Sequence, residues 1–183
     1  MYDLVKEYVA CLLCLEMTCK DGHYQAKGID FRQLHELFDT IIEGVDDAPL
    51  SDMRDNIQEI FFLGRGKDAM SGKEMLEKAS KWMKEPATSN EDLVKNVKEC
   101  LECALDTLAK ILQEDISQGE NDLFGSQGRE LQHRLGFLNM DYQYHRTHPC
   151  LLLQHKQGQA EAFLTNLLQA YWTLLLFYFH QIS

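Results

Sequence analysis

The sequence predicts an all-α fold, and two observations lead to this prediction. Apolar residues recur every three to four positions along almost the whole chain, which is the period of a helix with one buried face. Helix-breaking prolines are scarce in the 183-residue chain, where only three occur: Pro49, Pro86 and Pro149. A chain of this length with 45% apolar residues can bury its own core as one domain.

The first half of the chain is expected to form two long helical segments. An apolar stripe predicts the first over about residues 2–20. Asp30 can cap the second, which is predicted over 31–63. This segment is interrupted at 44–52, because Pro49 disfavours helix at the residue before it. After the interruption, Ser51 or Asp52 can start the helix again. Gly64 and Gly66 favour its end.

The second half is expected to contain four more segments. A short helix is predicted over 71–83, where it would cross from one long helix to the next. A capping signal at its start predicts a long helix over 88–117. After a turn at 118–121, another long helix is predicted over 122–144, and an apolar helix over about 159–180 closes the chain.

The C-terminal tail stands apart from this pattern. Residues 1–144 are expected to form the main helical bundle, with 145–183 as an extension that packs on it or at an oligomer contact. The most apolar stretch of the tail, 170–179, is too short to cross a bilayer. Four tail residues carry metal-binding side chains, although such a stretch is more often a solvated connector: His145, His148, Cys150 and His155.

Charge and cysteine usage restrict the function classes. The net charge is −11, and the 18 basic residues are scattered among 29 acidic ones. Nucleic-acid-binding domains normally show a basic face, whereas an acidic surface suits cations. No secretory signal is visible, so we expect a cytosolic protein whose six cysteines stay reduced.

One short stretch has the residues of a metal site. His35 and Asp39 are spaced i, i+4, so they share one face of a helix. His23 comes shortly before, near the end of the preceding helix. A second i, i+4 pair consists of carboxylates, Asp55 and Glu59. Imidazoles combined with several carboxylates suit iron, although spacing alone leaves open that these are separate surface residues.

The stretch from His23 to Asp39 resembles the ferroxidase segment of the Dps mini-ferritins, iron-storing proteins of bacteria. Tyr24 replaces a tryptophan of the family pattern. Weaker similarity over 62–80 and 128–135 extends the resemblance to about residues 10–138. Six residues stand at the family's spacings: His23, Gly28, Phe31, His35, Glu36 and Asp39.

The resemblance implies a ferritin-like four-helix bundle with a short crossover helix, assembled into a hollow dodecamer. In this family, iron is oxidised at a di-iron site between two subunits, preferably by hydrogen peroxide, and stored inside as ferric mineral. One chain would supply His23, His35 and Asp39. The neighbouring chain would supply an aspartate and a glutamate four residues apart, for which the candidates are Asp55 and Glu59.

The acidic pair departs from the family spacing. Asp55 follows Asp39 by sixteen residues, where the family has about eleven, and five extra residues turn a helix by roughly 140°. The insertion at 44–52 must therefore loop out if the pair is to reach the site.

The register of the acidic pair is a second departure. Counting back from Leu63 without a gap puts Arg54 and Gln58, which bind no iron, at the ligand positions. A shift by one residue restores Asp55 and Glu59, and we favour this shift because chance rarely supplies an acidic pair there.

The alternative hypothesis is a catalytically silent mini-ferritin shell, structural or DNA-binding, in which the insertion has displaced the carboxylates. DNA binding is not favoured, because no Lys/Arg-rich arm precedes the first helix. The tail has only two basic residues for phosphate contacts, Arg146 and Lys156.

Two further groups of residues carry metal-binding side chains. Glu130 and His133 form a Glu-x-x-His unit, but larger ferritins use two such units per subunit and this chain has one. His133 and Gly136 also replace an aromatic clamp of the family. The Cys-x-x-Cys pairs at 11–14 and 100–103 have the ligands for zinc or an iron–sulfur cluster. We favour buried core thiols, because such sites usually lie on turns.

Overall fold

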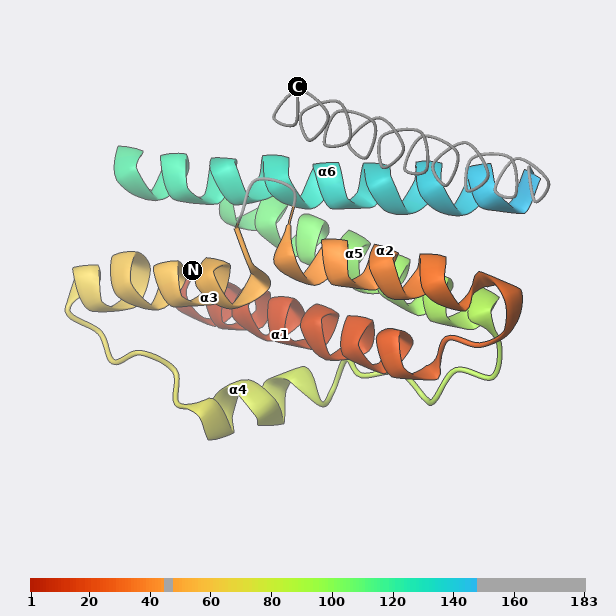
Figure 1. Cartoon of the computed structure of the whole chain (residues 1–183). Coiled ribbons are helices and arrows are strands. Elements are labelled where there is room, and N and C mark those ends of the chain that lie inside the picture. Colours follow the sequence, from red (N-terminus) through yellow and green to blue (C-terminus); the bar gives the residue numbers. More distant parts are fainter. Residues whose placement is uncertain (45–47, 148–183) are drawn as a thin grey trace, which may run out of the picture. The chain divides into compact units, whose positions relative to one another are not determined.

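A computed structural model describes residues 1–44 and 48–147 of the chain (Figure 1). In these residues it contains six α-helices and no β-strand, which confirms the all-α prediction. The chain divides into two compact units, Met1–Asp141 and Tyr142–Ser183, and the first of them holds the helical core and the candidate site. The helix predicted over 159–180 lies outside the described residues, as do His148, Cys150 and His155.

The six helices differ in length. Two short ones, α3 and α4, flank a π-helical turn and a loop, and the long ones carry most of the core. Their bounds are α1 Tyr2–Gln25, α2 Phe31–Glu43, α3 Leu50–Ile57, α4 Gly72–Ala79, α5 Asn90–Ile111 and α6 Gln118–Thr147. The π-helical turn spans Gln58–Phe62 and continues α3.

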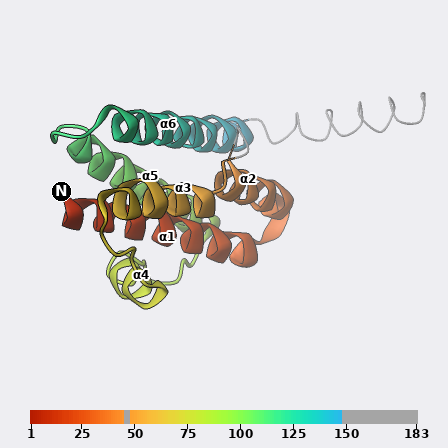
Figure 2. The same cartoon turned by 90° about the vertical axis from the view of Figure 1, so that its left-hand side faces the viewer.

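Helices α2 and α3 lie along α1 one after the other and run antiparallel to it (Figures 1 and 2). Near the end of α1, Gly22 packs against the ring of Phe38 on α2. Near its start, the ring of Tyr2 lies 5.4 Å from that of Phe61, just after α3. Together α2 and α3 therefore form one interrupted rod beside α1.

Helix α5 also runs antiparallel to α1. Cys11 on α1 contacts Cys103 on α5, and the backbone of Lys27 bonds the side chain of Asn90 at the start of α5. The α2–α3 rod and α5 consequently run in the same direction. Two consecutive helical segments that run in the same direction need a long connection, and the segment containing α4 makes this crossover.

Helix α6 completes the core. The amide of Gln127 donates to the carbonyl of Met53 on α3. Tyr8, Phe61 and Phe124 come from three different segments, and their fully buried rings meet edge to face around Phe124. Such aromatic contacts add to the stabilisation that burial of apolar surface provides.

Several predicted boundaries were wrong, including the end of the crossover helix α4, which is Ala79 instead of residue 83. Helix α1 continues past residue 20 to Gln25, and Gly22 in this extension packs against the ring of Phe38. Helix α5 ends at Ile111 instead of continuing to about 117. The turn predicted at 118–121 is the first turn of α6, because the Ser117 hydroxyl and the Glu120 carboxylate each accept from the other's backbone N–H.

The same buried Glu120 makes folding stability sensitive to acid. Arg65 donates two hydrogen bonds to its carboxylate, at 2.5 and 2.7 Å, and this contact lowers the pKa of Glu120 from 4.5 to about 2. Stability from this group is fully present above about pH 4.5, the pKa in the unfolded chain, and is lost as the pH falls toward 2.

Glu120→Gln is therefore expected to flatten the pH dependence of the unfolding free energy. Between pH 6 and pH 3 the wild type should lose about 2 kcal/mol more than the variant, as measured by urea denaturation. Glu114→Gln, at an exposed glutamate nearby, serves as the control. Equal losses in the wild type and Glu120→Gln would contradict this assignment.

Candidate metal centre

The three residues of the predicted site come together where α1 turns into α2. His23 lies in the last turn of α1, and His35 and Asp39 lie on consecutive turns of α2. The chain reverses between the helices at Gly28, whose φ of 77° is in the region that favours glycine. The turn folds the His-bearing end of α1 back onto the His35 face of α2.

Close packing next to His23 fixes the approach of the two helices. A Cβ atom at Gly22 would lie 2.7 Å from the ring of Phe38, a distance that real contacts essentially never show. Only glycine therefore permits α1 and α2 to lie this close. Since Gly22 immediately precedes His23, this contact also determines how near the His23 ring lies to α2.

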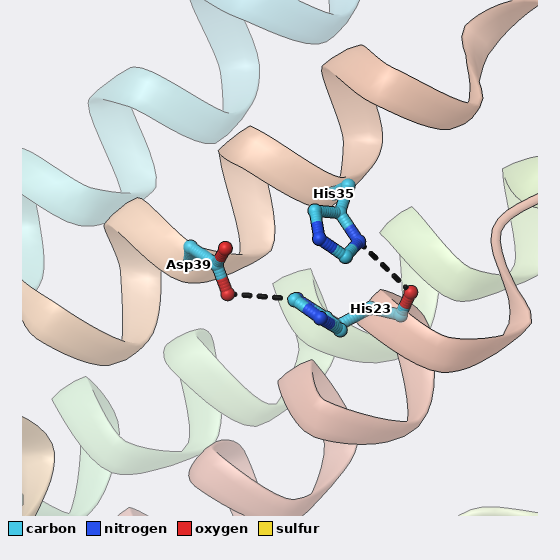
Figure 3. A group of neighbouring side chains, drawn as sticks. All are labelled: His23, His35 and Asp39. Atoms are coloured by element: carbon cyan, nitrogen blue, oxygen red, sulfur yellow. Dashed lines mark hydrogen bonds and ion pairs between the residues drawn. The ribbon is translucent and has the colours of Figure 1, made fainter.

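The side chains of His23, His35 and Asp39 point toward one another (Figure 3). One potential ligand atom from each lies within 4.8 Å of those of the other two. His23 Nδ1 is 2.7 Å from Asp39 Oδ1, yet this buried nitrogen makes no hydrogen bond, so the carboxylate oxygen lies outside the direction a ring N–H requires. In the tautomer with the hydrogen on Nε2, His23 Nδ1 has a lone pair that can bind an ion together with Asp39 Oδ1.

A backbone contact selects the tautomer of His35. Its Nδ1 lies 3.3 Å from the carbonyl oxygen of His23 (Figure 3). A carbonyl only accepts, so Nδ1 carries the hydrogen and Nε2 keeps the lone pair of the neutral ring. Metal-binding histidines commonly orient their rings through such a bond from the second nitrogen. The contact prepares His35 Nε2 as a ligand.

The site is partly exposed and has aromatic neighbours. The ring centroids of His23 and His35 lie 3.4 Å apart. The ring centroid of Tyr24 lies 5.1 Å from that of His23, and the ring centroid of Phe31 lies 5.3 Å from that of His35. The side chains of His23 and Asp39 are 22% and 44% exposed, so an ion can reach them from outside the chain. Two imidazole nitrogens and a carboxylate suit divalent first-row metals.

Asp55 and Glu59 do not join this group within one chain. Both are exposed, Asp55 on α3 and Glu59 in the π-helical turn. Among the described residues, the group of possible ligands found by proximity contains only His23, His35 and Asp39. The exposed acidic pair is thus free of the core and accessible to another molecule.

The residues at the unshifted register have structural contacts instead. Arg54 forms an ion pair with Glu16 on α1. Gln58 accepts from the backbone N–H of Met70 at 2.9 Å and donates to its carbonyl at 3.3 Å. These contacts turn Arg54 and Gln58 toward their own chain, which leaves the neighbouring positions facing outward.

Sequence reasoning missed Arg134, which is fully buried on α6. Its guanidinium donates to the carbonyl of Ile41 at 2.6 Å, to the carbonyl of Ala48, and to Glu130 Oε1 at 2.9 Å. It therefore holds both ends of the interruption between α2 and α3. No sequence signal marks Arg134 as buried, because arginine is normally exposed and is fully buried only with partners that the sequence does not reveal.

The Glu-x-x-His unit is not assembled as a metal site in the described residues. Glu130 pairs with Arg134, and His133 is exposed on the same helix. The contact with Arg134 explains the buried glutamate as a partner for a buried charge.

Comparison with known proteins adds no family assignment. No protein-family model matches the chain, and no curated protein is significantly similar to it. Within residues 1–44 and 48–147, no helix is long and apolar enough to cross a membrane. Evidence on function therefore comes from the geometry of His23, His35 and Asp39 together with the sequence resemblance.

Proposed function

We propose that this protein is a cytosolic, ferritin-like iron-oxidising and iron-storing protein of the mini-ferritin type. The observation that carries the proposal is the convergence of His23, His35 and Asp39 at the junction of α1 and α2. These are the three residues that the resemblance to Dps proteins assigns to one half of a di-iron site. Iron is the substrate of the proposed reaction.

The course of the helices supports a ferritin-like bundle. Helix α1, the α2–α3 rod, α5 and α6 are the four long elements, and the α4 segment is a single long crossover between the rod and α5, which run in the same direction. Four-helix bundles with one such crossover are the ferritin-like type.

The π-helical turn bears on the register of the acidic pair but does not account for the one-residue shift. A π-helical turn takes one more residue than an α-helical turn, because its hydrogen bonds reach one residue further along the chain. The turn at Gln58–Phe62 stands directly before Leu63, from which the register is counted. An extra residue before Leu63 would move the counted positions to Met53 and Ile57, whereas the shift to Asp55 and Glu59 requires one residue fewer. The choice of Asp55 and Glu59 therefore rests on their carboxylates and their exposure.

The second half of the site comes from a neighbouring copy in this proposal. Asp55 and Glu59 are exposed, carry two carboxylates and lie outside the ligand group of their own chain. Across a two-fold interface, each copy gives its acidic pair to the other, as in a symmetric dimer contact. This exchange is complete in a dimer, so the hollow dodecamer that the resemblance implies requires further contacts between dimers.

The chemistry follows from the donor set. The two imidazoles bind ferrous iron as neutral nitrogen ligands, and the carboxylates favour the ferric product through their negative charge. Each of two ferrous ions gives one electron to hydrogen peroxide, whose O–O bond breaks to give two hydroxide ions, and two ferric ions form. The net charge of −11 raises the local concentration of cations around the open site.

A catalytically silent shell is the second candidate, because α2 ends at Glu43 and α3 begins only at Leu50. If this interruption turns Asp55 away from the interface, the protein keeps the fold without the reaction. A gel-shift assay at physiological salt tests the DNA-binding form of this candidate, and we expect no retardation because the chain is acidic.

Iron oxidation and particle mass test the proposal together. The metal-free protein is mixed anaerobically with two ferrous ions per chain, and peroxide is then added while ferric absorbance is followed. We expect oxidation faster than in buffer and a solution mass of about twelve chains. A monomer or dimer without accelerated oxidation would contradict both the assembly and the inter-subunit site.

A further inference from the structure

Four cysteines face one another across the contact between α1 and α5. Two come from residues 11–14 on α1 and two from residues 100–103 on α5. The sulfur atoms of Cys11 and Cys103 lie 3.5 Å apart, and those of Cys14 and Cys100 lie 3.9 Å apart. The pairing is regular because the helices are antiparallel and each motif places its thiols one turn apart on one face.

We propose that these residues are two redox-active thiol pairs, Cys11–Cys103 and Cys14–Cys100, which hydrogen peroxide oxidises to two disulfides joining α1 to α5. The inference is independent of the proposed iron site, since neither pair includes or contacts His23, His35 or Asp39.

The helix packing suits such bonds. Packed helix axes lie about 8–10 Å apart, and each Cα lies about 2.3 Å from its axis. Facing Cα atoms are then about 3.5–5.5 Å apart, which overlaps the range of about 4.4–6.8 Å found in disulfides. Closing each pair requires the sulfur atoms to move toward one another without separating or unwinding the helices.

The difference in burial between Cys11 and Cys103 determines which of the two reacts with peroxide first. Cys103 is half-buried, whereas Cys11 is 2% exposed, so a small neutral oxidant reaches Cys103 first. The Cys103 sulfur attacks peroxide, the O–O bond breaks, and a sulfenic acid and one water form. The Cys11 sulfur then displaces the sulfenic oxygen as a second water and forms the S–S bond. Two thiol hydrogens and two electrons have passed to the peroxide.

In the second pair, Cys14–Cys100, one cysteine attacks peroxide and the other forms the disulfide with it. The hydrogen bond from the Cys14 thiol lowers the pKa of Cys100, and the nearby Thr18 hydroxyl and Lys84 charge lower it further. Burial opposes these effects but is smaller than the effect of Cys14. Cys100 is therefore the sulfur that attacks peroxide, because the thiolate is the nucleophile. Cys14 keeps its proton and resolves the sulfenic acid.

A four-thiolate metal site fits the arrangement less well. Among the described residues, the three-residue ligand group whose atoms all lie within 4.8 Å of one another is His23, His35 and Asp39, and no cysteine belongs to it. The thiols are close in pairs across the two helices, which is the geometry of disulfide formation.

Peptide mapping tests the proposal on metal-free protein in a Cys150→Ala background, which removes the thiol outside the described residues. The protein is reduced, freed of reductant, treated with peroxide in slight excess and alkylated. We expect alkylated cysteines to fall from the five that remain to one, Cys19. Trypsin should release residues 7–20 cross-linked to residues 99–110.

Single substitutions assign the pairs. Cys11→Ala should retain one disulfide, between Cys14 and Cys100, and Cys14→Ala should retain the other. Cys19→Ala, at a buried thiol of the same helix, is the matched control and should retain both. Disulfides confined within either tryptic peptide, sulfinic acids without cross-links, or thiols protected by a retained metal ion would each overturn the proposal. The peptide map of the protein with all four paired cysteines distinguishes these outcomes even if a variant does not fold.

Discussion

Replacement of Asp39 by asparagine is expected to slow ferrous iron oxidation by about 100-fold. Asparagine keeps the size of the side chain but removes the negative charge that favours ferric iron. Loss even of groups that only support metal ligands commonly costs about 10–100-fold, and a direct ligand should be at the upper end. The initial rate of peroxide-driven oxidation, measured by ferric absorbance under anaerobic mixing, gives the comparison.

Asp30→Asn provides the matched control for Asp39→Asn. Asp30 is exposed at the N-cap of α2, makes no capping hydrogen bond with its side chain, and does not belong to the ligand group of the site. The control should oxidise iron at the wild-type rate. His35→Ala should reproduce the loss seen with Asp39→Asn while the solution mass stays unchanged, because both residues are half-buried and polar. Wild-type rates in both variants would show that the site is not the ferroxidase centre.

Arg134→Met is expected to lower the free energy of unfolding by about 3–5 kcal/mol, the usual cost of removing one partner of a buried ion pair. Methionine fills part of the volume but leaves the carboxylate of Glu130 and the carbonyls of Ile41 and Ala48 without their shared donor. Urea denaturation at neutral pH measures the change.

Two variants separate this effect from general damage to α6. Arg129→Met changes an exposed arginine of the same helix and should alter stability by less than about 0.5 kcal/mol. The double variant Arg134→Met/Glu130→Leu should regain part of the loss, because it no longer leaves the Glu130 carboxylate buried without the Arg134 guanidinium. A loss in Arg134→Met no larger than that in Arg129→Met would contradict the role assigned to the buried guanidinium.

The helical fold and half of the candidate site follow from local patterns in the sequence. His35 and Asp39 share a face because of their i, i+4 spacing, and this relation holds in any α-helix. Their meeting with His23 depends on a contact between helices, which periodicity alone does not determine. The resemblance to Dps proteins supplied that expectation, and the structure brings the three residues together.

The features that sequence analysis missed depend on tertiary contacts or on small changes in helix type. Arg134 reads as a surface residue until the carbonyls at the interruption are known to face it. The π-helical turn at Gln58–Phe62 has the same residue types as an ordinary helix. Gly44 shows the same limit, since its φ of 84° and the crowding of a Cβ by Arg134 become evident only in three dimensions.

The capping box at the start of α6 is a different case, because its signal was present in the sequence. Ser117 and Glu120 have the spacing of the motif, but the intervening Gly119 favoured a turn. The reciprocal hydrogen bonds and the ion pair to Arg65 outweigh the cost of one glycine in a helix.

A crystal structure of the assembled protein loaded anaerobically with ferrous iron is the most direct test of the proposed function. Anomalous scattering at the iron edge locates the ions independently of their ligands. We expect two iron ions per site, bound by His23, His35 and Asp39 of one copy and by Asp55 and Glu59 of the next, with ligand distances near about 2 Å. No iron at His23, His35 and Asp39, with Asp55 directed to solvent, would contradict the proposal and favour a silent shell.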